Sequence, residues 1–127
     1  MESLIIKPKD DKPEIILDKG NRIFRIAGKS MPEDVLEFYK PVLDWFQMYL
    51  KNPLEETILD VDLEYFNTAS SKVLLDIFTL LEELAQSGKK AEVNWHYPDY
   101  DEDMMEAGEE YSELVELKFN LLPYKED

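Results

Sequence analysis

Residues 57–97 decide the fold and read TILDVDLEYF (57–66), NTASSK (67–72), VLLDIFTLLEELAQ (73–86), SGK (87–89) and KAEVNWHY (90–97). Apolar and polar residues alternate in the first segment, which is typical of a β-strand. In segment 73–86 the apolar residues recur every three or four positions, which is typical of an amphipathic helix, and Gly88 is a natural stop. A strand–helix–strand unit of this kind predicts a right-handed crossover between two parallel strands.

The residues before this unit predict an antiparallel hairpin. Short apolar segments at Ser3–Lys7, Glu14–Asp18 and Arg22–Ala27 are typical of strands. The last two segments flank Lys19-Gly20-Asn21, a sequence suited to a tight turn.

A first helix is expected to begin at Ser30-Met31-Pro32-Glu33 and to run to about Lys51. Ser30 and Glu33 have the spacing of a capping box, and a proline in the first turn loses no helical hydrogen bond. The stripe expected to face the core comprises Leu36, Tyr39, Leu43, Phe46 and Leu50. A second apolar stripe comprises Phe38, Val42, Trp45 and Tyr49. Either the second stripe is also buried within the domain, or it binds a partner through Phe38, Trp45 and Tyr49.

The C-terminal quarter is strongly acidic. Asp99–Tyr111 predicts a short helix, and Glu113–Phe119 predicts a last strand or an extended tail. The expected fold class is therefore α/β, with one domain over residues 1–127. It has a small mixed sheet, an N-terminal hairpin, two main helices on one face and a short acidic C-terminal helix.

The composition argues against binding to nucleic acid or membranes. The 127 residues carry a net charge of −15, from 14 basic and 29 acidic residues, whereas nucleic acids require basic patches and anionic lipids repel an acidic surface. A hydrophobic content of 44% excludes a disordered chain, and the absence of cysteine excludes disulfides and thiolate metal sites. The N-terminal MESLIIKPKDDKPE lacks the long apolar run of a signal peptide. We therefore expect a cytoplasmic protein.

The turn at residues 67–72 has two possible roles. Asn67 and Thr68 are suitable helix N-caps, so the turn can serve simply to satisfy free backbone amides. Alternatively, Thr68 is a phosphorylation site, because a phosphate there would lie over free amides at the positive end of the helix, with Lys72 one turn along. On physical grounds both roles stay open, and helix caps are more common than phosphorylation sites.

The turn also resembles the signature of a known bacterial family, the SiaC-type regulatory phosphoproteins. The resemblance rests on four segments that span nearly the whole chain, in the order found in the family: GKSMPE (28–33), EYFNTASSK (64–72), NWHY (94–97) and DMMEAGEE (103–110). One departure is Ala69, where the family usually has serine. It leaves Thr68 intact.

The resemblance implies a fold similar to the STAS domains of anti-sigma-factor antagonists and a regulatory, non-enzymatic role. Thr68 matches the family's phosphorylated threonine. The expected partners are a Ser/Thr protein kinase of the anti-sigma type and a PP2C-type phosphatase. In the best-known branch, the unphosphorylated protein also binds and activates a diguanylate cyclase, which controls cyclic di-GMP and biofilm formation. The residues expected to contact partners beside Thr68 are Tyr65, Asn67, Ser70, Ser71 and Lys72, and no cofactor is expected.

A competing interpretation is a small acidic enzyme or ligand-binding domain. Its pocket would lie at the same sheet edge, near Glu64, Asn67 and His96. His96 is the only histidine, and nothing nearby in the sequence forms a catalytic triad with it. A structural or solvent-facing histidine is therefore favoured.

The acidic segment also resembles a calcium-binding loop in part. Asp99, Asp101, Asp103 and Glu110 fall at positions 1, 3, 5 and 12 of the calcium-loop template. Met104, however, occupies the position where the template needs glycine. A solvated acidic face or a surface for a basic partner is favoured over a metal site.

Overall fold

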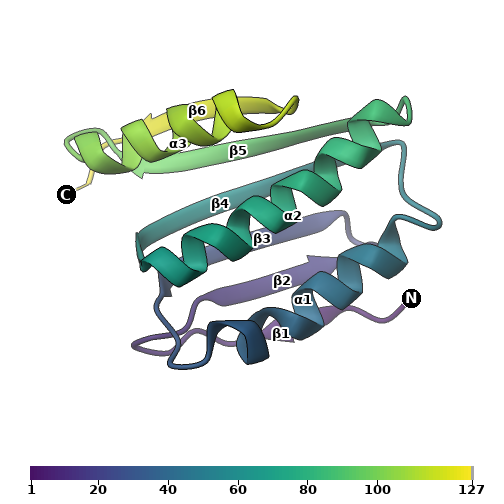
Figure 1. Ribbon diagram of the computed structural model, residues 1–127, viewed down its shortest axis with the longest axis horizontal. Helices are drawn as coiled ribbons and strands as arrows, with labels where there is room; N and C mark the ends of the chain where they lie inside the picture. The colour runs from purple at the N-terminus through teal and green to yellow at the C-terminus, as the bar shows by residue number, and fades with distance from the viewer. Residues whose placement is uncertain (127) are drawn as a thin grey trace.

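The computed structural model describes residues 1–126 (Figure 1). The elements in chain order are β1 (Leu4–Ile6), β2 (Glu14–Asp18), β3 (Ile23–Ser30), α1 (Val35–Tyr49), β4 (Glu56–Phe66), α2 (Thr68–Gln86), β5 (Lys90–Pro98), α3 (Glu102–Leu114) and β6 (Lys118–Tyr124). The α/β class with an N-terminal hairpin is confirmed. The last strand expected at Glu113–Phe119 is present, but its bounds were predicted wrongly, because α3 continues to Leu114 and the strand begins only at Lys118.

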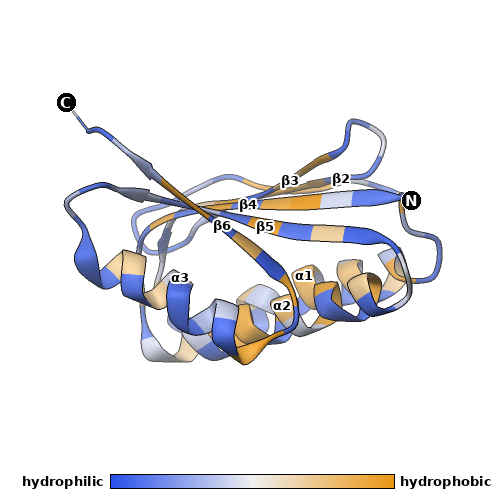
Figure 2. Ribbon diagram, turned by 90° about the horizontal axis from the view of Figure 1, so that it is seen from above, coloured by the Kyte–Doolittle hydropathy of each residue, from blue (hydrophilic) through white to orange (hydrophobic). Residues whose placement is uncertain are grey.

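The six strands form one sheet in the order β1-β2-β3-β4-β5-β6. The first three strands pair antiparallel, and β3 to β6 pair parallel. Each parallel connection passes through one helix and moves one strand further in the same direction. Because such crossovers are right-handed, all three helices are placed on the same face of the sheet, as Figure 2 shows. Within residues 1–126, the opposite face carries no helix.

Alternation along the strands separates the two faces. In β4, Thr57, Leu59, Val61 and Leu63 are buried beneath the helices, while the residues between them are more exposed. The same pattern in β5 buries Trp95, the largest fully buried side chain of the protein. The core therefore lies between the sheet and a single helical layer.

The start of α1 differs from the expected capping box. The N-cap is Asp34, whose carboxylate accepts a hydrogen bond from the amide of Glu37 at 3.0 Å. Ser30 instead ends β3, opposite Phe66 of β4, and its side chain is fully buried. Continued strand pairing turns Ser30 into the core, which is why it is not available as a cap.

The buried face of α1 also differs from the expected stripe. Leu36 is 72% exposed, because the face turned to the core is made by Val35, Tyr39, Val42, Trp45, Phe46 and Tyr49. Trp45 stacks on Tyr49 with ring centroids 5.1 Å apart, and the Tyr49 hydroxyl lies 2.6 Å from that of Thr57. Trp45 and Tyr49 are therefore core residues, which confirms the alternative that the second stripe is buried and corrects their prediction as partner contacts. Phe38 is half-buried, edge-on against Tyr39.

Helix α3 is seated on the sheet through a glycine. A Cβ atom at Gly108 would lie 2.6 Å from Cδ1 of Trp95, so no larger residue fits without displacing the helix or the indole. The indole N–H donates a hydrogen bond of 2.9 Å to the carbonyl of Met104 in the same helix. Trp95 thus fixes α3 against the sheet through close packing at Gly108 and a buried hydrogen bond to Met104.

Candidate functional site

The candidate site is the turn between β4 and α2, at the carboxyl edge of the parallel strands. Asn67 is the N-cap of α2, since its side-chain oxygen accepts a hydrogen bond of 2.8 Å from the amide of Ser70. The Asn67 amide donates to the carbonyl of Ser30 at 3.0 Å, which ties the turn to the end of β3. The predicted cap is therefore confirmed at Asn67, and Thr68 is the first residue of the helix.

Thr68 is exposed to solvent. Within residues 1–126, its hydroxyl and the backbone amides of Thr68 and Ala69 have no hydrogen-bond partner. The first turn of α2 also contains no acidic residue. The positive end of the helix dipole is therefore open to an added anion at this point.

Ser70 lies on the opposite side of the same turn and is fully buried. Its hydroxyl donates to the carbonyl of Ser30 at 2.9 Å and accepts from the Ser30 hydroxyl at 2.8 Å. The Tyr39 hydroxyl, 2.6 Å from the Ser30 hydroxyl, is then the donor in that pair. Burial raises the pKa of Tyr39 to about 12, so it keeps its proton at neutral pH. Ser70 was predicted as a partner contact, and its burial in this hydroxyl chain corrects that prediction.

The remaining predicted contact residues surround Thr68 with graded exposure. Tyr65 is 52% exposed and Lys72 is exposed, whereas Asn67 and Ser71 are half-buried. The Ser71 hydroxyl donates to the carbonyl of Thr68 at 2.7 Å. These residues remain predicted partner contacts, and the structure places them around one corner of the molecule.

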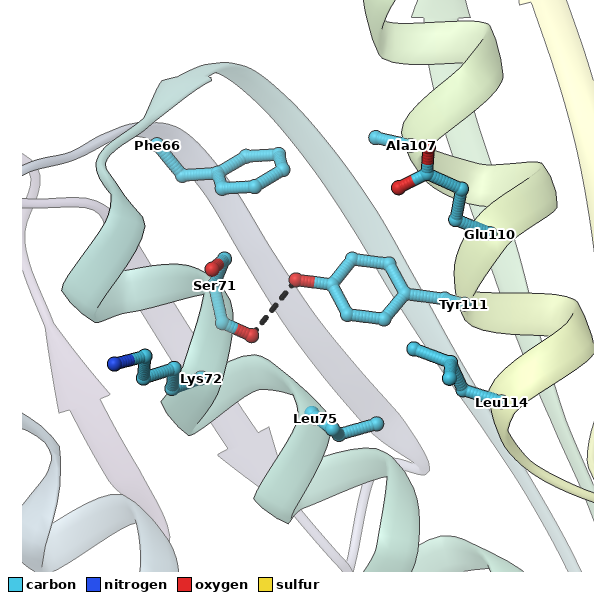
Figure 3. A pocket seen from close by; sticks show the side chains of 8 residues that line it. All are labelled: Phe66, Ser71, Lys72, Leu75, Ala107, Glu110, Tyr111 and Leu114. Atoms are coloured by element: carbon cyan, nitrogen blue, oxygen red, sulfur yellow. Dashed lines mark hydrogen bonds between the residues drawn. The ribbon is translucent and has the colours of Figure 1, made fainter.

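Two adjoining hollows lie between α2 and α3 beside this corner. The larger, about 340 Å³, is lined by Phe66, Ser71, Lys72, Leu75, Ala107, Glu110, Tyr111 and Leu114 (Figure 3). The smaller, about 260 Å³, is lined by Glu64, Tyr65, Phe66, Asp101, Asp103, Met104 and Ala107. Phe66 and Ala107 line both hollows.

Tyr111 crosses between the two helices in the larger hollow. Its hydroxyl donates a 2.8 Å hydrogen bond to the carbonyl of Ser71, as Figure 3 shows. Burial raises the pKa of Tyr111 well above its ordinary value, so the hydroxyl stays a donor at physiological pH. This apolar side of α3 was not predicted from the sequence. The recurrence of Met104, Ala107, Tyr111 and Leu114 at helical spacing is the signal that could have found it.

The pocket of the competing interpretation is not assembled. His96 lies on the sheet face without helices, where its Nε2 is 2.8 Å from a carboxylate oxygen of Asp60. Glu64 lines the smaller hollow, but neither Asn67 nor His96 lines it. The three residues therefore do not share that cavity.

The acidic segment is a helix rather than a calcium loop. Asp101 is the N-cap of α3 and accepts a hydrogen bond of 3.0 Å from the amide of Met104. Asp103 and Glu110 lie on the helix itself. Among residues 1–126, no group of three or more acidic or histidine side chains is arranged to hold a metal ion. Over the same range, no helix has both the length and the apolar character needed to cross a bilayer.

Comparisons with known proteins agree on one family. The pattern of the SiaC family regulatory phosphoproteins matches residues 6–124. An uncharacterized protein of Pseudomonas aeruginosa strain UCBPP-PA14 is 32% identical over 126 residues, covering 99% of this chain and 100% of that protein. The crystal structure of apo-SiaC from Pseudomonas aeruginosa is 32% identical with a TM-score of 0.89, covering 96% of this chain and 99% of that one.

A second solved structure adds information on binding in a relative. It is the crystal structure of the diguanylate cyclase SiaD in complex with its activator SiaC from Pseudomonas aeruginosa. A chain of that complex superimposes with a TM-score of 0.90 at 32% identity, covering 95% of this chain and 99% of that one. The relative thus acts by binding to an enzyme.

Proposed function

The chain belongs to the SiaC family of regulatory phosphoproteins, and we propose on that basis that phosphorylation of Thr68 switches it between partner proteins. The observation that carries the proposal is the exposed Thr68 hydroxyl at the start of a helix whose first turn has no acidic residue. In this scheme the protein catalyses nothing, and Thr68 acts only as an acceptor.

The electrostatics of the turn favour a phosphate on Thr68. A phosphate carries a charge of about −1.5 to −2 at neutral pH. It would lie beside the unpartnered amides of Thr68 and Ala69, where the helix dipole stabilises negative charge. Lys72 follows Thr68 by four residues and therefore lies on the same side of α2, where it supports the modified state.

The burial of Ser70 supports Thr68 as the acceptor in this turn. A kinase must reach the hydroxyl that it modifies, and Ser70 is sealed between α1, α2 and β3. Ser71 is half-buried, and its hydroxyl is already bonded to the carbonyl of Thr68. Thr68 is therefore the most accessible of the three hydroxyls.

The proposed partners follow the family. A Ser/Thr kinase of the anti-sigma type would add the phosphate, and a PP2C-type phosphatase would remove it. The unmodified form would bind a downstream target such as a diguanylate cyclase, as the relative does. Phosphate would add charge and bulk at the corner formed by Tyr65, Thr68 and Lys72, and so weaken that complex.

The test compares three variants for binding to the diguanylate cyclase encoded in the same genome. Thr68→Asp should lose binding that Thr68→Ala keeps. Thr79→Asp is the matched control, because Thr79 is also exposed on α2 but lies three turns away. Equal binding by Thr68→Asp and Thr68→Ala would contradict the proposal. Equal loss in Thr79→Asp would show that charge on α2, rather than the site, is responsible.

The acceptor itself is tested separately by mass spectrometry. Phosphopeptides from the protein purified from its native cells should carry phosphate on Thr68. Phosphate found only on other residues would overturn the assignment, whatever the binding results.

A further inference from the structure

The two neighbouring hollows between α2 and α3 are together called the α2–α3 groove. They adjoin at Phe66 and Ala107, which line both. Leu75, Met104, Tyr111 and Leu114 supply further apolar surface, and Leu114 remains 64% exposed. Apolar surface that stays open in a small acidic protein is a candidate contact for another molecule.

The shape of the groove suits a helix. Its α3 wall runs from Asp103 to Leu114, which is about 16 Å along the helix axis at 1.5 Å per residue. Its other wall is the N-terminal part of α2, at Ser71, Lys72 and Leu75. A third helix of two to three turns can lie between two such walls with its side chains in the space between their ridges.

The negative charge around the groove favours a positively charged partner. Among the residues that the structure describes, four carboxylates line it, from Glu64, Asp101, Asp103 and Glu110, against the single cation of Lys72. The other acidic residues of α3 extend this field over the outer surface of the helix. A second copy of this chain would bring another net charge of −15 and is disfavoured by repulsion.

We propose that the α2–α3 groove binds a basic amphipathic helix of a partner protein. Apolar side chains on one face of that helix lie between Phe66 and Ala107, and its flanking lysines or arginines lie beside Asp103 and Glu110. This inference goes beyond the proposed function. The proposal concerns the surface to which a partner binds, and it does not depend on phosphorylation of Thr68.

The test is a titration of the isotopically labelled, unphosphorylated full chain, followed by amide chemical shifts in NMR spectra. The probe is a synthetic peptide of about 14 residues, about 21 Å long as a helix, with leucines on one face and lysines flanking them. Shift changes are expected at Ser71, Leu75, Ala107 and Leu114. A peptide of identical composition, reordered so that it has no apolar face, should bind at least tenfold more weakly.

Two variants and a control locate the binding. Ala107→Trp fills the point shared by both hollows and should weaken binding at least tenfold. Leu114→Asn removes apolar contact at a 64% exposed position and should weaken it several-fold without unfolding the chain. Leu36→Trp, at a 72% exposed position on α1, should leave binding unchanged.

Three results would overturn the proposal. They are equal affinity for the reordered peptide, unchanged affinity of both groove variants, or shift changes confined to the sheet face without helices. None of these measurements depends on the state of Thr68. Failure of the groove and failure of the phosphorylation switch are therefore distinguishable.

Discussion

Helices α2 and α3 begin with the same geometry but with different charge. In α2, the side chain of Asn67 accepts from the amide of Ser70 at 2.8 Å; in α3, Asp101 accepts from the amide of Met104 at 3.0 Å. The α3 cap is a carboxylate, and its first turn adds Glu102 and Asp103. The α2 cap is a neutral amide, and its first turn has no acid.

Helix α1 follows the acidic pattern of α3. It is capped by Asp34 and carries Glu37 in its first turn. Of the three helices among residues 1–126, α2 alone starts without a negative charge. Two helix dipoles are therefore compensated by acidic residues of the sequence, whereas the third, at α2, is not. Under the proposed function, the phosphate on Thr68 supplies that missing charge reversibly.

The largest effect is expected from a substitution at the third residue of α2, Ser70. This position is buried in α2, as is the corresponding Met104 in α3. Ser70→Ala removes the acceptor of the Ser30 hydroxyl, so that the hydrogen of this buried hydroxyl no longer has an acceptor. We expect the free energy of unfolding to fall by about 1–3 kcal/mol, measured by urea denaturation. Ser71→Ala is the neighbouring control and should cost less than about 0.5 kcal/mol. Equal losses in the two variants would show that the hydroxyl chain does not stabilise the turn.

A smaller effect comes from exchanging the two caps. Asn67→Asp gives α2 the charge that α3 already has and should stabilise the protein by about 0.3–1 kcal/mol at low ionic strength. Asp101→Asn should destabilise it by a similar amount, since it removes that charge from α3. Both changes should shrink as salt is added. Changes of the same sign would mean that cap geometry rather than charge controls the difference.

The smallest effect is expected at Lys72, and it tests whether this lysine stabilises a phosphate on Thr68. In the unphosphorylated protein, Lys72→Ala should change the unfolding free energy by no more than a few tenths of a kcal/mol. In the phosphorylated protein it should remove about 0.3–0.5 kcal/mol more, as an exposed pair four residues apart does. Urea midpoints of both forms give the difference. Lys51→Ala, at an exposed lysine beyond α1, should act equally on both forms.

The central elements were predictable because their apolar periodicities are strong. The boundaries of β2 match the prediction, those of β4 and α2 are close to it, and the cap at Asn67 follows from residue type. The face of α1 was predicted only in part, since Tyr39 and Phe46 are buried as expected but Leu36 is exposed. The buried side of this helix is determined by contacts with other elements. The indole of Trp45, for example, donates to the carbonyl of Glu2 at 2.9 Å, 43 residues away.

The position of the candidate site could be predicted from the sequence, but the burial of its side chains could not. Residue type and spacing placed Thr68 at the start of a helix on the sheet edge. They could not show that Ser70 is buried, because its partners Ser30 and Tyr39 lie in distant parts of the chain. The groove was missed for a similar reason, since its bridge from Tyr111 to Ser71 spans 40 positions.

The buried hydroxyl chain limits the number of hydroxyls in this turn that a kinase can reach. With Ser70 sealed and Thr68 open, each molecule under the proposed function is either off or on, with no graded series of modified forms. A cell would then read the balance of kinase and phosphatase as the fraction of molecules in each state. A change in kinase or phosphatase activity would then change the fraction of phosphorylated molecules and not the state of any single molecule in steps.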